Sequence, residues 1–299
     1  MQPDQASITA ENNALLRTHE SLRPEKERIC NDTYAAWFLP GRLMDVVDRN
    51  QQIRQTVETW ENRFPGIVNS ILARTRFIDD CLEAAIGEGI RQLVILGAGY
   101  DTRVLRFGAL RDKVAVFELD HLETQRIKLQ RIQAQVGADL PHVRFIPIDF
   151  SEDNLGEKLF AQGYDAQLET FFIWEGVTYY LPGAAVDGTL AFIRRYAGRG
   201  SSVVFDYFPP SVAAGTTDLV EARALRDGLQ TIGEAIVFGI APDRIAEFLG
   251  QRGFRVTAHL TSTDYQARYF FDVNRGRRVS DMFIFVQARV DDSIDQHQQ

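Results

Sequence analysis

The chain shows two hydrophobic patterns, one after the other. From about residue 13 to residue 90, apolar side chains such as Ile67, Ile71 and Ile78 recur at the spacings of a helix face. From Gln92 onward, short apolar runs alternate with helical segments. This alternation predicts an α/β fold with a parallel, doubly wound sheet, preceded by a helical N-terminal region.

Seven segments have the length and apolar character of strands. The expected strands are Leu93–Leu96, Val114–Leu119, Val143–Ile148, Leu168–Trp174, Ser202–Phe205, Phe254–Leu260 and Met282–Ala288. The expected helices between them are Leu122–Gln135, one that Ser151 opens, one from Pro182 to about Tyr196, and Pro242–Leu249. If the last two strands form a hairpin-like pair at one edge, the sheet is mostly parallel and has seven strands, with one antiparallel strand at the end.

The pattern divides the chain into two parts at about residue 90. Residues 1–90 are expected to form a helical cap, and residues 1–13 within it are polar and expected to be mobile. Residues 91–299 are expected to form the ligand-binding domain, because ligands of doubly wound folds bind at the carboxyl edge of the sheet. An insertion of helical character, at about 209–238, follows the fifth strand.

Composition and charge narrow the class of protein. Of 299 residues, 45% are apolar and 25% are charged, and the net charge of -8 argues against a nucleic-acid partner, because phosphate binding needs a basic face. Cys30 and Cys81 are too few for a disulfide framework, and a core of this size needs neither disulfide nor metal. The N-terminus lacks an apolar signal segment, and no apolar run reaches the roughly 18 residues of a membrane helix. We therefore expect a cytoplasmic protein without a membrane partner.

The segment around the first expected strand is the first candidate site. In Gln92–Phe107, QLVILGAGYDTRVLRF, Gly97 and Gly99 allow a tight turn and a close approach of backbone N–H groups to a ligand. For this pair alone, a turn that needs glycine only for its geometry is an equal alternative. Thr102 stands where the dinucleotide fingerprint has a third glycine, and Asp101 would repel a pyrophosphate. The loop favours a ligand without pyrophosphate and with a positive charge, and S-adenosylmethionine meets both conditions.

Acidic residues follow the next strands at the same edge. Asp120 follows Gly99 by 21 residues, a position from which a carboxylate can bind both ribose hydroxyls, and Glu118 is the alternative on the same face. Asp149, after the third strand, is placed to meet an adenine amino group or to cap the next helix. Glu175 follows a strongly apolar strand and needs a partner, either a ligand ammonium group or a nearby arginine.

These segments together resemble the leucine carboxyl methyltransferase family of class I S-adenosylmethionine-dependent methyltransferases. The resemblance covers about residues 73–208 and a looser tail, and its most specific string is LGAGYDTR, since Asp-Thr-Arg after the glycines is unusual elsewhere. The motifs, in family order, are ARTRFIDD (Ala73–Asp80), LVILGAGYDTRVLRF, VFELD, FIPIDF and WEGVTYYL, followed by GIAPDRIAEFLGQRGFRV. The resemblance implies a Rossmann-like methyltransferase sheet and S-adenosyl-L-methionine as the methyl donor.

The resemblance also implies which residues meet the methionine part of the donor. Arg74, the arginine before the first strand, is expected to pair with the methionine carboxylate, and Arg76 is a second candidate for this role. Glu175 is expected near the α-amino group, and Tyr180 matches a family tyrosine near the same pocket. A family lysine of the N-terminal region has no evident counterpart here, so no residue is assigned to its place.

The same resemblance implies the residues that meet the rest of the donor. Gly97 and Gly99 are expected to form the loop beneath the methionine part. Asp120 is expected to bind the ribose, and Asp149 and Phe150 the adenine. The cofactor set therefore draws on the ends of four consecutive strands.

The expected reaction transfers a methyl group from a sulfonium to an oxygen atom. The donor is already activated, so a carboxylate acceptor needs no general base, whereas an alcohol or phenol calls for one. Of the histidines only His121 stands near the expected pocket, no catalytic residue is assigned, and no spacing resembles a metal site. We expect an O-methyltransferase that acts on a carboxylate or hydroxyl of a small apolar or aromatic metabolite, with acceptor contacts from the cap and the insertion.

Three alternatives remain open from the sequence. A protein C-terminal carboxyl methyltransferase should show a wide, open acceptor groove instead of a closed pocket. An NAD-dependent oxidoreductase needs a pyrophosphate site, which Asp101 and the absent third glycine disfavour. A methyltransferase-like module that only binds a partner would not need the complete cofactor set.

Overall fold

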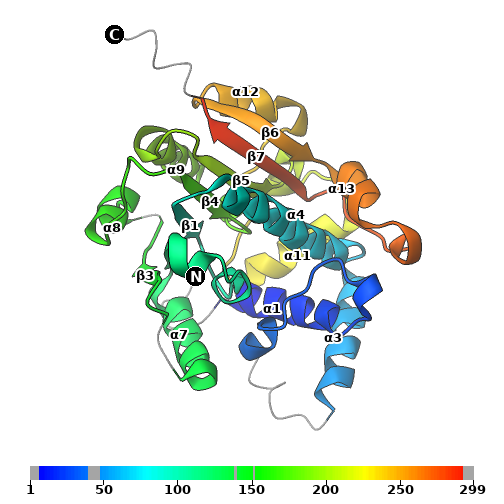
Figure 1. Cartoon of the computed structure of the whole chain (residues 1–299). Coiled ribbons are helices and arrows are strands. Elements are labelled where there is room, and N and C mark those ends of the chain that lie inside the picture. Colours follow the sequence, from blue (N-terminus) through cyan, green and yellow to red (C-terminus); the bar gives the residue numbers. More distant parts are fainter. Residues whose placement is uncertain (1–6, 40–47, 138–139, 151, 292–299) are drawn as a thin grey trace.

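A seven-stranded sheet forms the centre of the protein (Figure 1). The computed structural model describes residues 7–39, 48–137, 140–150 and 152–291. The strands are β1 (Gln92–Leu96), β2 (Ala115–Asp120), β3 (Val143–Pro147), β4 (Thr170–Trp174), β5 (Ser202–Tyr207), β6 (Phe254–Leu260) and β7 (Ile284–Val290). Their order is β3-β2-β1-β4-β5-β7-β6, and β7 runs antiparallel to both of its neighbours. The predicted doubly wound, mostly parallel sheet of seven strands is confirmed.

The pair formed by β6 and β7 differs from the expected hairpin. The helix α13 (Ser262–Tyr269) and the loop after it join the two strands, and β7 lies between β5 and β6. The antiparallel strand therefore lies inside the sheet, next to its outer strand. It also begins two residues later than the expected start at Met282, because the strand pairing with β5 begins at Ile284.

Helices lie along the sheet and around its carboxyl edge. The N-terminal region contributes α1 (Ile8–Ser21), α3 (Arg49–Arg63) and α4 (Ile67–Glu88), of which α4 contacts β4, β5 and β7. In Figure 1, α4 crosses the sheet close to β5 and β7. The remaining helices are α5 (Arg103–Arg106), α6 (Leu110–Lys113), α7 (Leu122–Val136), α8 (Leu155–Ala161), α9 (Gly183–Tyr196), α10 (Pro210–Ala214), α11 (Val220–Thr231) and α12 (Ile245–Gly250). The predicted insertion holds α10 and α11, while the division of the chain at residue 90 stays a prediction.

Three helices begin differently from the prediction. Two of them start at other residues, and the third starts with a 3₁₀ turn in place of an α-helical turn. The chain is helical from Ile8, because the Ser7 side chain accepts the N–H of Ala10 at 3.1 Å and caps the helix. The predicted mobility is therefore wrong for residues 8–13. Residues 1–6 lie outside the described part. Ser151 also lies outside it, and the helix expected there begins at Leu155 behind an Asn154 cap. The helix expected from Pro242 starts as a 3₁₀ turn before α12.

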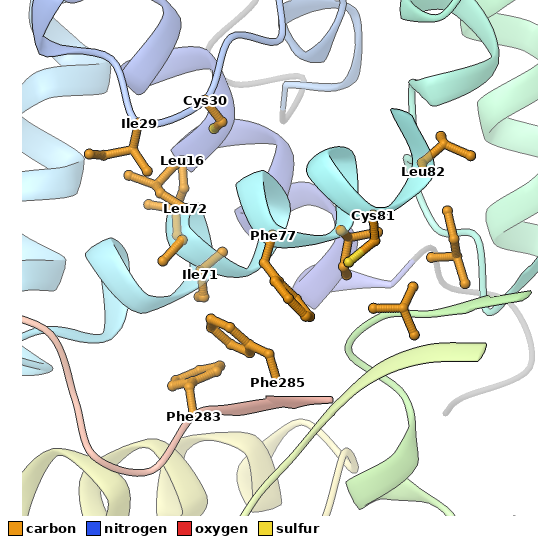
Figure 2. Packing of buried hydrophobic residues seen from close by; sticks show 14 of the residues in the cluster. Leu16, Ile29, Cys30, Ile71, Leu72, Phe77, Cys81, Leu82, Phe283 and Phe285 are labelled. Atoms are coloured by element: carbon orange, nitrogen blue, oxygen red, sulfur yellow. The ribbon is translucent and has the colours of Figure 1, made fainter. Parts of the chain in front are cut away.

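The sheet is buried on both faces, as its parallel strands require. Alternate residues of β1 enter two separate apolar clusters, with Leu93 and Ile95 in one and Val94 and Leu96 in the other. The first cluster joins the sheet to α4. Figure 2 shows side chains of α4, among them Phe77, facing Phe283 and Phe285 of the last strand region. The rings of Phe77 and Phe285 stack with their centroids 5.8 Å apart.

The start of α4 is fixed by a glycine that no other residue can replace without strain. Gly66 has φ +85° and precedes the helix as its N-terminal cap residue. A Cβ atom at this position would lie 2.5 Å from the carbonyl carbon of Val279. Because the backbone of a loop in the C-terminal half closes against Gly66, the helix enters the core at a defined point.

Candidate functional site

A cavity of about 380 Å³ lies at the carboxyl edge of the parallel strands. Its wall has two parts. The strand wall consists of residues 95, 97–103, 120–121, 148–150, 175–177 and 180–181, at or after the ends of β1 to β4, together with Arg74 and Thr75 of α4 and Arg106 of α5. The cap wall consists of Ser7, Thr9, Ala10, Asn13 and Arg17 in or next to α1, and of residues 233–235 after α11. All eight residues predicted for the donor site line this cavity: Arg74, Gly97, Gly99, Asp120, Asp149, Phe150, Glu175 and Tyr180.

The glycine turn after β1 brings two chain segments into direct contact. Gly97 has φ +69°, and a Cβ atom on it would lie 2.3 Å from Cγ2 of Val177. The N–H groups of Gly97 and Ala98 donate to the carbonyl of Leu119 at 2.8 and 2.9 Å, which ties the turn to β2. Glycine at position 97 is therefore required by geometry, and the same turn also lines the cavity.

Asp120 ends β2 with its carboxylate held by the backbone. Its Oδ2 accepts the N–H of Gly99, and its Oδ1 accepts the N–H of His121 at 2.6 Å. Burial raises the pKa of Asp120, and these two N–H groups oppose the rise. Each oxygen keeps a further lone pair with which it can accept a hydroxyl of a ligand.

The alternative residue on β2, Glu118, lies elsewhere. Its side chain is 1% exposed, and its Oε2 accepts from Nζ of Lys128 at 2.5 Å. It is not among the residues that line the cavity. Burial raises the pKa of Glu118 to about 7, although Lys128 lowers it. Position on the sheet thus favours Asp120 over Glu118 as the residue that meets a ligand.

Arg74 reaches the cavity from the middle of α4 and is surrounded by acceptors. Its Nε donates to Oε1 of Glu175 at 3.0 Å, and its Nη1 donates to Oδ2 of Asp206 at 2.8 Å. The hydroxyl of Tyr179 lies 3.3 Å from Nη1. Arg76, the second candidate, points away to Asp80 at 2.7 Å and does not line the cavity. The two arginines that spacing could not separate are therefore separated by their positions.

Glu175 forms ion pairs with two arginines, whereas the sequence left open whether its partner is an arginine or a ligand ammonium group. Besides Arg74, Nη1 of Arg103 donates to its Oε2 at 2.8 Å. Burial acts to raise the pKa of Glu175, but Arg103 and Arg74 lower it to about 2. Glu175 is therefore ionised at neutral pH, and its side chain remains 15% exposed toward the cavity it lines.

Arg103 corrects the expected role of Asp101. The carboxylate of Asp101 forms an ion pair with Nη1 of Arg103 and accepts the N–H of the same residue at 2.6 Å. Arg103 is 2% exposed, and it also donates to Asp79 at 2.7 Å. The argument that Asp101 would repel an anion is therefore wrong as stated, because Arg103, two residues later, compensates its charge. The Asp-Thr-Arg string is an ion pair built into the turn.

Arg17 of α1 is a cavity residue that the sequence reasoning missed. Its Nε donates to Asp32 at 2.8 Å, and its Nη2 donates to the carbonyl of Tyr100 at 2.7 Å. Its Nη1 makes no hydrogen bond to another described residue, and the side chain lines the cavity. A signal was present, because Arg17 directly follows the apolar residues Ala14, Leu15 and Leu16 on a helix that begins earlier than expected.

The adenine-side residues and the cap wall complete the cavity. Asp149 and Phe150 follow β3 and line it, and Tyr180 lines it from the turn after β4. Thr9 of α1 donates its hydroxyl to Glu234 of the insertion. The carbonyl of Tyr179 accepts the N–H of Val237 at 2.8 Å. The turn after β4 thus holds the insertion, and the insertion holds α1.

Among the described residues, no group of three or more His, Cys, Asp or Glu side chains is placed to hold a metal ion. His121 lines the cavity beside Asp120, and its Nδ1 has no hydrogen-bond partner in the described part of the chain. In the part of the chain that the structure describes, no helix is both long and apolar enough to cross a membrane. The chemical groups offered to a ligand are therefore arginines, carboxylates, backbone N–H groups and aromatic rings.

Comparisons with known proteins agree on one family. The model of the leucine carboxyl methyltransferase family matches residues 10–194. A Mycobacterium avium (strain 104) protein named "Putative S-adenosyl-L-methionine-dependent methyltransferase" is 33% identical over 261 residues, 85% of this chain and 83% of that protein. YktD of Bacillus subtilis (strain 168), with the same description, is 30% identical over 202 residues, 67% of this chain and 65% of that protein.

A crystal structure agrees on the fold. A Thermobifida fusca YX protein, named a "putative methyltransferase", superposes with a TM-score of 0.60 over 95% of this chain and 98% of that chain, at 15% identity. The family match, the relatives and the sheet order lead to one conclusion. The chain belongs to the leucine carboxyl methyltransferase family, and it is an S-adenosyl-L-methionine-dependent methyltransferase with the class I fold.

Proposed function

We propose that the cavity binds S-adenosyl-L-methionine along the strand wall and that the enzyme methylates a carboxylate oxygen of a small apolar or aromatic metabolite. The ribose lies at Asp120, the adenine at Asp149 and Phe150, and the methionine part at Arg74 and Glu175. The cavity volume of about 380 Å³ is in the range of roughly 300–1,000 Å³ that small-molecule sites occupy. Hydroxyl acceptors are the alternative within the same proposal.

The methionine part of the donor fits the charges at one end of the cavity. It carries one carboxylate and one ammonium group, and the wall offers ionised Glu175 beside the guanidinium groups of Arg74 and Arg103. Arg74 and Arg103 are largely taken up by carboxylates of the protein. Arg17, whose Nη1 has no hydrogen-bond partner among the described residues, is therefore a further candidate for the donor carboxylate.

The acceptor is proposed to be a carboxylate because acidic groups of the cavity wall already have partners, as Glu234 has in Thr9. Glu175 has a pKa of about 2 and accepts from two arginines, so it does not take a proton at neutral pH. Asp101 is paired with Arg103. His121 stands beside Asp120, at the end proposed for the ribose. A carboxylate is already ionised at neutral pH and needs none of these groups.

The chain supplies alignment and shielding for this reaction. When bound, the sulfonium of S-adenosyl-L-methionine supplies an activated methyl group for in-line displacement. Held at Arg74 and Glu175, the donor would present its methyl group to an acceptor oxygen, and the methyl group would pass from the sulfur to that oxygen without a proton transfer to or from the chain. The arginine and carboxylate pairs hold the donor in one orientation, and the cap wall excludes water from the oxygen and the methyl carbon.

The single observation that carries the choice of a small acceptor is the contact between α1 and the insertion. Thr9 donates to Glu234, and both residues line the cavity, so the cap wall is continuous from α1 to residues 233–235. A wall bridged in this way narrows the cavity and suits a small molecule, whereas the C-terminus of a protein needs an open groove. The protein carboxyl methyltransferase alternative is tested in the same experiment.

The experiment is a transfer assay with methyl-labelled S-adenosyl-L-methionine on matched acceptors. Each aromatic or aliphatic carboxylic acid is paired with its primary amide and with the corresponding phenol or alcohol. We expect label only in the acids, and we expect alkali to release it as methanol, because esters hydrolyse and ethers do not. Alkali-stable label in phenols would establish the hydroxyl alternative and overturn the carboxylate proposal.

A second arm separates small molecules from proteins. Peptides that end in a free carboxylate are compared with the same peptides ending in an amide. Transfer to free peptide termini and to none of the small acids would overturn the small-molecule proposal. Binding of S-adenosylhomocysteine, followed by calorimetry in parallel, shows that the donor site is intact in every preparation.

A further inference from the structure

Asp206 stands behind the donor cavity, outside its wall. It lies on β5, and its side chain is fully buried. It is not among the residues that line the cavity. Asp206 is not part of any motif on which the family resemblance rests. A buried carboxylate needs compensation by charge or hydrogen bonds, so its partners indicate what it holds in place.

The partners of Asp206 flank Glu175 on two sides. Its Oδ2 accepts Nη1 of Arg74 at 2.8 Å, and Arg74 in turn donates to Glu175. Its Oδ1 accepts the N–H of Gly176, the residue after Glu175, at 2.6 Å. Both oxygens of one carboxylate therefore hold a neighbour of Glu175, one through a side chain and one through the backbone.

The backbone of Asp206 holds the same turn at a third point. The hydroxyl of Thr178 donates to the Asp206 carbonyl at 2.6 Å. Gly176 has φ +72°, a left-handed conformation that the chain adopts at the end of β4. Two hydrogen bonds from the turn, at Gly176 and Thr178, and one from the guanidinium of Arg74 thus converge on Asp206 and fix the course of the turn from Glu175 to Thr178.

We propose that Asp206 is a positioning residue for the methionine part of the donor, acting through Arg74 and through the turn after Glu175. This inference rests on the proposed donor site, in which Arg74 and Glu175 meet that part. Asp206 touches no residue proposed to bind the adenosine part, which lies at Asp120, Asp149 and Phe150 on the far side of β1. Its loss should therefore affect one half of the donor more than the other.

Two ligands report on the two halves. S-adenosylhomocysteine has the adenosine and the amino-acid part, whereas 5′-methylthioadenosine keeps the adenosine and the thioether but lacks the amino-acid part. For Asp206→Asn we expect the dissociation constant of S-adenosylhomocysteine, measured by calorimetry, to rise about 10-fold or more, the range for a hydrogen bond to a charged group. We expect that of 5′-methylthioadenosine to change less than about 2-fold.

The matched control is Glu20→Gln. Glu20 is also fully buried, accepts the N–H of Ile29 at 2.7 Å, and pairs with Arg277 at 2.7 and 2.8 Å, but it does not line the cavity. It should lower the melting temperature and leave both dissociation constants unchanged. Equal weakening of both ligands by Asp206→Asn would show a merely structural role and overturn the inference.

Glu175→Gln separates this inference from the donor site on which it rests. If Glu175→Gln shows no selective loss of S-adenosylhomocysteine, the donor assignment is wrong. If it shows that loss and Asp206→Asn does not, only the positioning role is wrong. In the double variant we expect the two effects to be less than additive, because both act on one turn. Should Asp206→Asn fail to fold, Thr178→Val removes one anchor of the turn, and the same selective loss is required of it.

Discussion

The two walls of the donor cavity are built by different means. The strand wall is held by glycine turns, backbone N–H groups and buried ion pairs, such as Arg103 with Asp101 and Glu175. In the cap wall, α1 is packed against its neighbours, but α1 and the insertion meet through the hydrogen bond of Thr9 with Glu234, and Gly233 and Ala235 beside it are exposed. We therefore expect the strand wall to fix the pose of the donor, and we expect the end of the cap wall at Thr9 and Glu234 to vary with the acceptor.

The largest expected effect concerns the charge pairs of the strand wall. The pKa of Glu175 is lowered from 4.5 to about 2. The stabilisation from its arginines is therefore complete above about pH 4.5 and is lost as pH falls toward about 2, in total about 3 kcal/mol. Urea unfolding of the wild type and of Glu175→Gln, at about pH 6 and about pH 3, should show a loss of roughly 2 kcal/mol in the wild type beyond that in the variant. Equal losses of unfolding free energy in the wild type and in Glu175→Gln would contradict this prediction.

Asp120→Ala should weaken donor binding severely while the fold stays intact. The side chain holds Gly99 and His121, and in the proposed site it accepts two ribose hydroxyls. We expect the dissociation constant of S-adenosylhomocysteine to rise about 100-fold, in keeping with two lost hydrogen bonds to a charged group. Calorimetry measures it, and circular dichroism checks the fold. An unchanged constant would remove the ribose assignment.

Arg74→Ala and Arg76→Ala form a matched pair on one helix. Arg74 is 2% exposed and lines the cavity, whereas Arg76 lies at the surface against Asp80. We expect Arg74→Ala to raise the Michaelis constant for S-adenosyl-L-methionine about 10-fold or more and Arg76→Ala to leave it nearly unchanged. The opposite ranking would give the role to Arg76.

The smallest effect is expected at the cap wall. Thr9→Val removes the hydroxyl that donates to Glu234, at an exposed end of the cavity. We expect the Michaelis constant for S-adenosyl-L-methionine to stay within about 2-fold of the wild-type value, while the Michaelis constant for the carboxylate acceptor changes by about 3-fold. A large effect on the donor and none on the acceptor would show that the two walls do not divide their work in this way.

The strand wall could be predicted residue by residue from the sequence, whereas for the cap wall only the two contributing segments, the N-terminal cap and the insertion, could be predicted. Gly97, Asp120, Asp149 and Glu175 lie at the ends of strands or within two residues after them, and a parallel sheet brings the ends of its strands to one edge whatever the loops do. The order of the strands alone was therefore enough to predict that these residues surround one cavity. Their contacts with the donor stay predictions that the binding experiments test.

The residues that escaped the sequence depend on long-range packing. Arg17 reaches the cavity only because α1 folds back beside the turn after β1, and Asp206 matters only because β5 lies next to β4. The error about Asp101 has a shorter cause. The charge of Asp101 does not act alone, because Arg103 follows two residues later and compensates it.

The helix α4 ties donor affinity to the integrity of the core. Phe77 packs on Phe285 inside the molecule, and Arg74 lies one turn earlier on the same helix. A rotation of α4 by a single residue, roughly 100°, would carry the guanidinium away from Glu175. Substitutions that loosen the packing around Phe77, far from any ligand, should therefore lower melting temperature and donor affinity together, so that selection for one property also maintains the other.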